Sequence, residues 1–309
     1  MAGTGPERMR GTDGPQADVT PTSSEASTDR VIGMGAPFFF EPEMFSGVAQ
    51  DLRERFLAGE PFSHVVIDGL LPDDVLDEVV EESPGPNERN DWLHADRPDT
   101  IKWSIPNDWA LGPTTRQLLN QFNGATFINF LEELTGISGL IPDPHYFGGG
   151  LHQHERDGFL KIHADFNWHQ RLHLDRRLNV LLYLNRDWQE DWGGSLELWN
   201  AEMTHRVESI APLFNRMVIF ATTDTSYHGH PEPMTCPAGT RRRSLALYYY
   251  TNGRPEEEKS PSHSTVYKVR PGEKKYPMPS PPKQRITWRD FSPPIALKCA
   301  RQVRAALRR

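Results

Sequence analysis

Short extended segments dominate the chain after Pro144, and they restrict the folds that are open to it. Five segments are rich in β-branched, aromatic or apolar residues: 159–165, 178–185, 195–199, 216–221 and 242–250. Gly, Asn, Asp and Pro residues separate them, which is the pattern of short strands joined by turns. Many short strands in succession favour a β-sandwich or jelly roll.

Helical patterns come before these strands. A short strand is expected over 63–68, and a helix follows from Leu71, with a proline and two acidic residues in its first turn, where they suit the positive end of the helix dipole. A second helical region is expected over about 114–134, broken near Gly124, with Gly136 placed for a C-terminal cap. The sequence therefore predicts an α+β fold in which a helical layer covers a β core.

Composition divides the chain around this core. The first 36 residues are polar and almost free of apolar side chains, which predicts a disordered tail over 1–36. The segment 37–145 is expected to pack on the core as a strand and helical region, and 146–253 to form the jelly-roll domain itself. The Pro-, Ser- and Lys-rich remainder, 254–309, is expected to be a C-terminal extension with a short basic helix at 295–309.

Charge, cysteine content and hydropathy limit the partners and the compartment. A formal net charge of −8 argues against a general nucleic-acid binder. The two cysteines, Cys236 and Cys299, have no short spacing, so they predict neither a disulfide framework nor a zinc knuckle and they fit a reducing compartment. No apolar run has the length of a membrane span or of a signal-peptide core. We therefore expect a cytoplasmic protein with neither a nucleic-acid nor a membrane partner; oligomeric state is not readable.

Three residues form a candidate metal site. His163 and Asp165 alternate in an expected strand, so their side chains share one face. His228 follows a later apolar strand after a short loop and supplies a third ligand. Two imidazoles and one carboxylate suit Fe(II) and leave coordination positions open. His230 competes with His228, but His228 comes first after the loop, and Pro231 restrains the backbone of His230.

Other histidines weaken any argument from a single motif. The chain has twelve histidines, and an isolated His-x-Asp is weak support for a metal site. The pattern gains weight only as a set, with a late histidine and an arginine beyond it. We treat four more histidines as non-ligands: His152, His154, His169 and His173. Of these, His169 and His173 are expected near the pocket mouth.

The last expected strand carries a candidate anion site. Arg242 and Ser244 alternate and share a face. A guanidinium binds a carboxylate through two parallel hydrogen bonds, and a serine two residues on adds a third. Tyr183 and Asn179 lie on the inward face of a neighbouring strand and are further candidate donors. The alternative is that 241–243 is a solvated basic cluster, but an Arg-Ser pair opening an apolar and aromatic strand favours a buried site for a dicarboxylate.

The order of these motifs resembles that of a known family. His163-Ala164-Asp165, Leu181-Leu182-Tyr183-Leu184-Asn185, Asp187-Trp188, Gly193-Gly194, His228 and Arg242 follow one another. This order resembles the prolyl 4-hydroxylase-like branch of the Fe(II)/2-oxoglutarate dioxygenases. The resemblance covers about residues 146–252, a third of the chain. The glycine-rich segment 147–153 and the tyrosine-rich segment 248–253 are similar to a bacterial subgroup of these enzymes, which implies no substrate.

The resemblance implies a double-stranded β-helix and a set of cofactors. It places His163, Asp165 and His228 on Fe(II), and Arg242 on the C5 carboxylate of 2-oxoglutarate, assisted by Tyr183. The interval between His228 and Arg242 is longer than in those relatives, so Arg243 remains the substitute for this role. Dioxygen is the oxidant, and ascorbate is expected as a reductant.

The activity that the resemblance implies is hydroxylation of an unactivated C–H bond, with release of succinate and CO₂. The expected substrate is an aminoacyl, prolyl-like group, free or within a peptide, or another small molecule. Alternatives are desaturation or cyclisation in secondary metabolism, and a non-catalytic or regulatory module that binds 2-oxoglutarate and metal. A halogenase of this superfamily needs a small residue in place of the carboxylate ligand, and Asp165 argues against it. A zinc hydrolase has no need for the Arg242–Ser244 pair.

Overall fold

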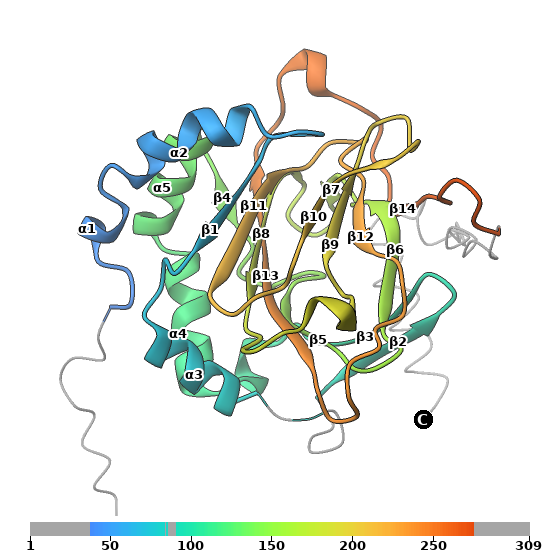
Figure 1. Ribbon diagram of the computed structural model, residues 1–309. Coiled ribbons are helices and arrows are strands. Elements are labelled where there is room, and N and C mark those ends of the chain that lie inside the picture. The colour runs from blue at the N-terminus through green and yellow to red at the C-terminus, as the bar shows by residue number, and fades with distance from the viewer. Residues whose placement is uncertain (1–37, 84, 86–90, 275–309) are drawn as a thin grey trace, which may run out of the picture. The chain divides into compact units, whose positions relative to one another are not determined.

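An antiparallel sheet that curls back on itself forms the centre of the molecule (Figure 1). The computed structural model describes residues 38–83, 85 and 91–274. The expected disordered tail over 1–36 and the expected basic helix over 295–309 lie outside these described residues.

The strands follow the order β1-β11-β8-β13-β5-β3-β6-β12-β9-β10. Four short strands pair beside this path: β2 with β3, β4 with β13, β7 with β8, and β14 with β6. Their bounds are β1 His64–Asp68, β2 Leu93–Arg97, β3 Thr100–Ile105, β4 Ile141–Pro142, β5 Gly150–His154, β6 Phe159–Ala164, β7 Trp168–His169, β8 Leu174–Tyr183, β9 Leu196–Trp199, β10 Arg206–Ile210, β11 Arg216–Ala221, β12 His228–His230, β13 Arg242–Thr251 and β14 Val266–Tyr267.

The curled sheet has two halves that one strand joins. One half contains β1, β11, β8, β13 and β5, and the other contains β6, β12, β9 and β10. Strand β3 pairs with both, because Trp103 to Ile105 pair with β5 while Thr100 and Ile101 pair with β6. The expected double-stranded β-helix, or jelly roll, with an N-terminal helical layer is therefore confirmed. All five segments expected to be extended are strands.

Five α-helices of the described residues lie before β4, with β1, β2 and β3 between them in the chain, and they cover the outer face of the larger half of the roll (Figure 1). The expected break near Gly124 falls between two of them, and Gly136 has the left-handed backbone of a C-terminal cap, with φ of 75°. The helices are α1 Pro42–Phe45, α2 Val48–Leu57, α3 Asp73–Glu81, α4 Pro113–Phe122 and α5 Ala125–Thr135, and three short 3-10 turns are η1 Asp108–Ala110, η2 Glu190–Trp192 and η3 Glu256–Glu258.

An aromatic cluster fixes the helices to the sheet. Its ring centroids lie 4.8 to 5.8 Å apart, with many edge-on contacts, and its members are Phe40, Phe45, Phe122, Phe127 and Phe130. The hydroxyl of Tyr249 donates a hydrogen bond of 2.9 Å to the carbonyl oxygen of Phe122. Because alternate residues of a strand face opposite ways, Tyr249 packs into this cluster while Tyr248 lines the interior of the roll. The helical layer therefore holds β13, the strand that carries Arg242.

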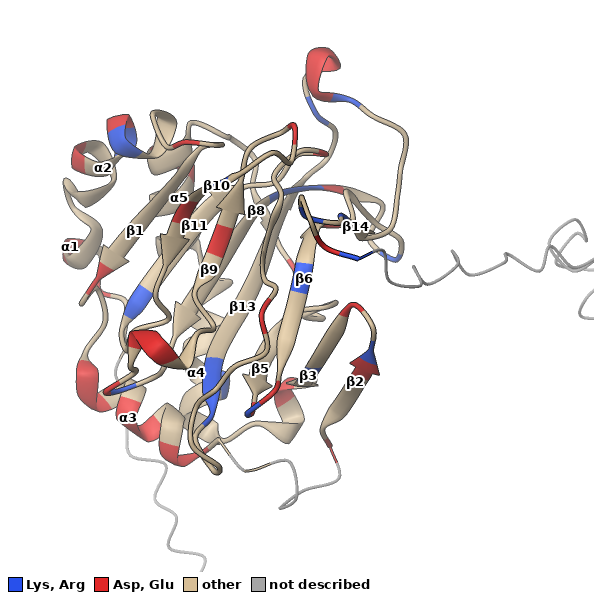
Figure 2. Cartoon of the chain, turned by 45° about the vertical axis from the view of Figure 1, so that its right-hand side comes forward, with Lys and Arg blue, Asp and Glu red and all other residues tan. Residues whose placement is uncertain are grey.

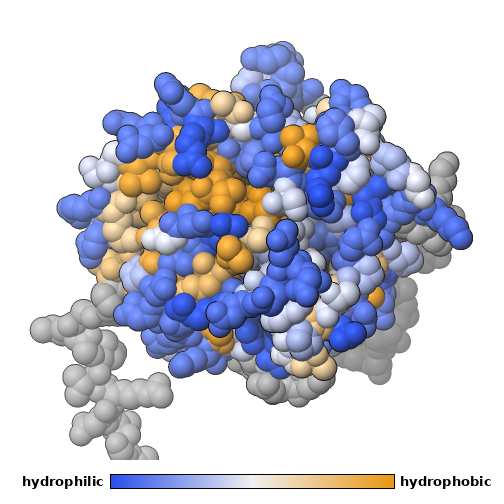
Figure 3. Space-filling view, viewed as in Figure 1, coloured by the Kyte–Doolittle hydropathy of each residue, from blue (hydrophilic) through white to orange (hydrophobic). Residues whose placement is uncertain are grey.

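Charged residues occur in both the helical layer and the sheet. Figure 2 marks acidic positions on the helices, α3 among them, and basic positions on β13 and β6. In Figure 3 apolar side chains gather on the face that carries α2 and β1, within an otherwise hydrophilic surface. None of the helices in the described part of the chain has the length and apolar character needed to cross a bilayer.

Candidate functional site

A cavity of about 210 Å³ lies inside the roll, between its two halves. It is lined by residues of β2, β3, β5, β6, β8, β9, β12, β13 and β14. All seven residues that the sequence singles out for metal or cosubstrate line it: His163, Asp165, Asn179, Tyr183, His228, Arg242 and Ser244. Residues that lie up to 81 positions apart in the chain therefore face one space.

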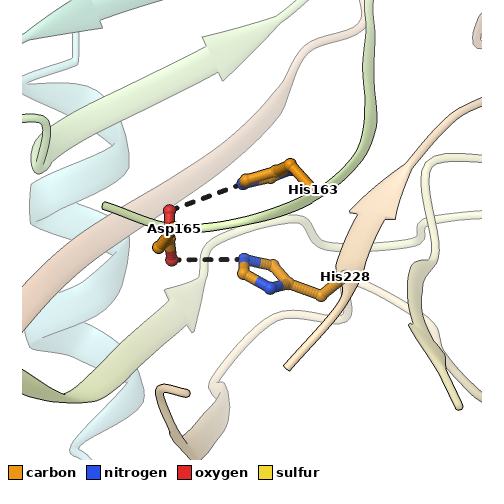
Figure 4. Close-up of side chains that lie close together, drawn as sticks. All are labelled: His163, Asp165 and His228. Carbon is orange, nitrogen blue, oxygen red and sulfur yellow. Dashed lines mark ion pairs between the residues drawn. The ribbon is translucent and has the colours of Figure 1, made fainter. Parts of the chain in front are cut away.

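His163, Asp165 and His228 line this cavity, and their side chains point toward one another (Figure 4). His163 in β6 and His228 in β12 are direct register partners, and Asp165 follows β6. The Nε2 atoms of both histidines lie 3.5 Å from the carboxylate oxygens of Asp165. Ligand atoms bound at about 2.1 Å to one ion lie about 3 to 4 Å from one another. The three side chains are thus spaced to share one cation.

Backbone carbonyls fix the tautomer of both histidines. The Nδ1 atom of His163 lies 2.8 Å from the carbonyl oxygen of Lys161, and that of His228 lies 2.9 Å from the carbonyl oxygen of Ser226. A carbonyl only accepts, so each Nδ1 carries the proton and each Nε2 directs a lone pair at the shared position. Burial, followed by the nearby His163, lowers the pKa of His228 to about 4. His228 is therefore neutral near pH 7, as a metal ligand must be.

Two side chains of β8 hold Asp165 in place. Asn179 donates a hydrogen bond of 2.8 Å from Nδ2 to Oδ2 of Asp165, and Arg176 lies 3.0 Å from the same oxygen. Arg176 also donates to Oδ1 of Asn179. Burial alone raises the pKa of Asp165, but Arg176 and the two histidines hold it well below its usual range. Asn179, expected to contact the cosubstrate, here has both amide atoms engaged by Asp165 and Arg176.

Sequence reasoning missed Arg176, which is fully buried. Its guanidinium carbon lies 3.5 Å from the ring centre of Tyr248 and 4.5 Å from that of Phe166. Strict alternation places Arg176 on the opposite strand face from Asn179. The pairing of β8 with β13 contains a register shift there, and such a bulge moves a side chain to the other face. No signal in the sequence marks that bulge.

Arg242 of β13 also lines the cavity. Its Nε donates a 2.7 Å hydrogen bond to the carbonyl oxygen of Gly194, and its Nη2 donates one of 3.3 Å to the Tyr183 hydroxyl. Ser244 pairs with Tyr183 in the neighbouring strand. Burial raises the pKa of Tyr183 although Arg242 opposes the shift, so the phenol keeps its proton. These groups place a guanidinium and two hydroxyls together within the cavity.

Arg243, the substitute for Arg242, does not line the cavity. It is half-buried, and its backbone nitrogen and oxygen are held by the side chain of Asn185. Adjacent residues of a strand point to opposite faces, which explains why only one of the two arginines reaches the interior.

The other buried histidines of the cavity are neutral and stand outside the cluster of three. His154 and His230 face each other with 3.1 Å between their Nε2 atoms, and His152 bonds to the carbonyl oxygen of Gly148. Burial is the main cause that lowers the pKa of all three well below the usual value. His169 and His173, expected near the pocket mouth, are not among the cavity's lining residues.

Comparison with known proteins agrees with this geometry. Residues 149–250 match the family model of the 2OG-Fe(II) oxygenase superfamily. This match confirms the resemblance to Fe(II)/2-oxoglutarate oxygenases, and together with the site it supports an oxygenase that depends on 2-oxoglutarate. A search among curated proteins gives no match.

A search of solved structures gives matches at low sequence identity. A prolyl-4-hydroxylase from Pseudomonas putida is 19% identical, with 67% of this chain and 99% of that chain covered and a TM-score of 0.45. A prolyl hydroxylase from Trichoplax adhaerens, solved with a peptide fragment of hypoxia inducible factor, is 17% identical. The match covers 68% of this chain and 90% of that chain, with a TM-score of 0.46. HygX from Streptomyces hygroscopicus, solved with nickel, 2-oxoglutarate and hygromycin B, is 14% identical. The match covers 70% of this chain and 97% of that chain, with a TM-score of 0.46. None of these similarities specifies a substrate for this chain.

Proposed function

We propose that the protein is an Fe(II)- and 2-oxoglutarate-dependent dioxygenase that hydroxylates an unactivated C–H bond of an aminoacyl or other small-molecule substrate. The observation that carries this proposal is the convergence of His163, Asp165 and His228 in the cavity that also holds Arg242. Bound iron supplies the activation of dioxygen by which 2-oxoglutarate is converted to succinate and CO₂ and one oxygen atom enters the substrate.

The three clustered residues fit the proposed metal. Two imidazoles and an ionised carboxylate form the donor set expected for non-heme Fe(II), and no thiolate that favours zinc lines the described cavity. The carbonyl oxygens that bind each Nδ1–H fix the ring orientation and raise the basicity of Nε2. We assign to Arg176 and Asn179 the role of orienting Asp165 rather than of contacting the cosubstrate.

Arg242 fits the distal carboxylate of 2-oxoglutarate. Its guanidinium is buried among Tyr183, Gly194 and Ser244, with no carboxylate of the described residues paired to it. A buried cation without a counter-ion is costly, and a dicarboxylate that reaches from the metal to β13 removes that cost. Tyr183 and Ser244 add hydroxyl donors, which makes the site specific for a planar anion.

Iron-dependent release of succinate tests the proposal. The purified chain, supplied with Fe(II), 2-oxoglutarate and ascorbate as reductant, is expected to form succinate, and the Asp165→Ala variant is expected to form none above background. The matched control Asp51→Ala changes an exposed carboxylate of α2 and retains turnover. Full activity of Asp165→Ala contradicts the assigned metal site, and absence of succinate with wild-type protein favours a non-catalytic binding module.

A further inference from the structure

Lys102 of β3 is a charged cavity residue to which the proposed chemistry assigns no role. It lies outside the segment that matches the family model, on the strand that joins the two halves of the roll. Register places it next to His154, because the following residues Trp103 and Ser104 pair with Gln153 and His152. Its side chain lines the same cavity as the metal cluster.

The charges around the cavity leave Lys102 without a counter-ion. Among the described lining residues the cationic side chains are Arg97, Lys102, Arg176 and Arg242, against the single carboxylate of Asp165. Arg97 pairs with Asp99 at 3.0 Å, and Arg176 pairs with Asp165. Arg242 is assigned to the cosubstrate. Within the described part of the chain Lys102 makes no hydrogen bond and no ion pair.

Lys102 and Arg242 lie on either side of His154 in the sheet, since Arg242 pairs with His154 and the register of β3 with β5 continues to Lys102. Burial lowers the pKa of Lys102 to about 8, and the nearby carboxylate of Asp165 opposes that shift. One carboxylate of the proposed cosubstrate is assigned to the metal and the other to Arg242. The cosubstrate therefore leaves the charge of Lys102 without a carboxylate of its own.

We propose that Lys102 binds a carboxylate of the primary substrate, so that this substrate is a small free acid, such as an amino acid, rather than a residue within a peptide. The inference rests on the proposed function and specifies the substrate class of that same site. A peptide-bonded residue has an amide where a free amino acid has its carboxylate, and a neutral amide gives the ammonium no counter-charge. Binding the anion pairs a partly desolvated charge, which a neutral analogue leaves unpaired.

The size of the cavity agrees with a small acid. Its volume is about 210 Å³, below the roughly 300 to 1,000 Å³ typical of sites for drug-sized ligands, and it has to contain the cosubstrate as well. Thr265 and Tyr267 of the segment around β14 line the cavity beside His163, with the Tyr267 ring 5.5 Å from that of His163. Side chains from outside the matched segment thus border the space next to the metal.

Calorimetric titration of the full chain loaded with Ni(II) and 2-oxoglutarate tests this inference. The probes are the twenty protein amino acids as free acids, and then the carboxamides of those that bind. We expect at least one free acid to bind saturably and its amide at least tenfold more weakly. In Lys102→Gln the dissociation constant of the acid is expected to rise at least tenfold, while that of 2-oxoglutarate changes less than threefold. The matched control Lys259→Gln removes an exposed lysine outside the cavity and leaves both constants unchanged.

Three results overturn the inference: no free acid binds, an amide binds as tightly as its acid, or Lys102→Gln weakens 2-oxoglutarate instead of the acid. Succinate formation, measured on the same preparations, separates this outcome from failure of the proposed function. If the protein binds an acid through Lys102 but forms no succinate, the inference about Lys102 holds and the proposed oxygenase function is wrong. If the protein oxidises only amides or peptides, the proposed function holds and the inference about a free acid is wrong.

Discussion

At the scale of single residues, the two arginines at the start of β13 have different tasks. Arg242→Ala removes a buried guanidinium, so we expect the dissociation constant of 2-oxoglutarate to rise at least about 30-fold, which corresponds to about 2 kcal/mol. Arg243→Ala changes a half-buried neighbour on the opposite face and is expected to change that constant less than threefold. Titration of both metal-loaded variants with 2-oxoglutarate measures the difference. The reverse order transfers the role to Arg243.

Arg176 acts on the metal through Asp165. Loss of such a supporting contact typically weakens metal binding about 10- to 100-fold, so Arg176→Met is expected to do so. Arg177→Met is the matched control, because Arg177 follows directly in β8 but pairs with Glu258, which does not line the cavity. Competition with a chelator under anaerobic conditions measures Fe(II) affinity. Equal affinity of the two variants refutes the positioning role of Arg176.

At the scale of elements, the close contact between β6 and β12 sets the spacing of the two histidines. A Cβ atom added at Gly229 meets the carbonyl oxygens of Leu160 and Lys161 at 2.7 and 2.9 Å. These are backbone atoms, so Gly229→Ala has to move β12 away from β6 and separate His228 from His163. We expect a loss of about 1 to 3 kcal/mol in unfolding free energy and at least tenfold weaker Fe(II) binding.

Gly239 provides the comparison for that change. Nothing lies within 4 Å of a Cβ at Gly239, whose φ is 86°, so Gly239→Ala introduces backbone strain without a contact between strands. Chemical denaturation and metal titration of both variants separate the two effects. Unchanged iron affinity in Gly229→Ala means that β12 adjusts without moving His228.

Strands from outside the matched segment belong to the same sheet. Before residue 146, β1 pairs with β11 and β3 pairs with β5 and β6, and after 253, β14 pairs with β6. We propose that the division expected at 146 and 253 marks the extent of the motifs and that the chain folds across it.

At the scale of the whole molecule, burial of neutral histidines makes stability depend on pH. His228 has a pKa of about 4 in the folded protein, against about 6.5 when unfolded. Between pH values of about 4 and 6.5, His228 is therefore protonated in the unfolded chain but neutral in the folded protein. Stability of the metal-free protein is therefore expected to fall by about 3 kcal/mol as the pH decreases from about 6.5 to 4. His152, His154 and His230, whose pKa values are also lowered, add to this loss.

Denaturant unfolding across this pH range measures the effect, and His228→Gln removes one of the titrating groups. The variant is expected to show a shallower decrease in unfolding free energy than the wild type. Identical slopes for the two proteins contradict the assignment of the low pKa to His228.

The sequence predicts the part of the molecule that periodicity controls. Alternation places His163 with Asp165 and Arg242 with Ser244, and the glycines at 124 and 136 mark real helix ends. The bulge that turns Arg176 inward, and the pairing that brings Lys102 beside residues more than 45 positions later, depend on register between distant strands. Local pattern carries no information about such register, so these residues emerge only from the three-dimensional arrangement.

The position of β3 affects how substrate recognition can change during evolution. The hairpin of β2 and β3 reaches the cavity from a stretch of chain that contributes nothing to the proposed iron ligands. Substitutions in this hairpin can therefore alter which molecule is recognised while the oxidative machinery stays intact. Related enzymes with the same iron ligands and a different hairpin are accordingly expected to catalyse the same type of reaction on different substrates.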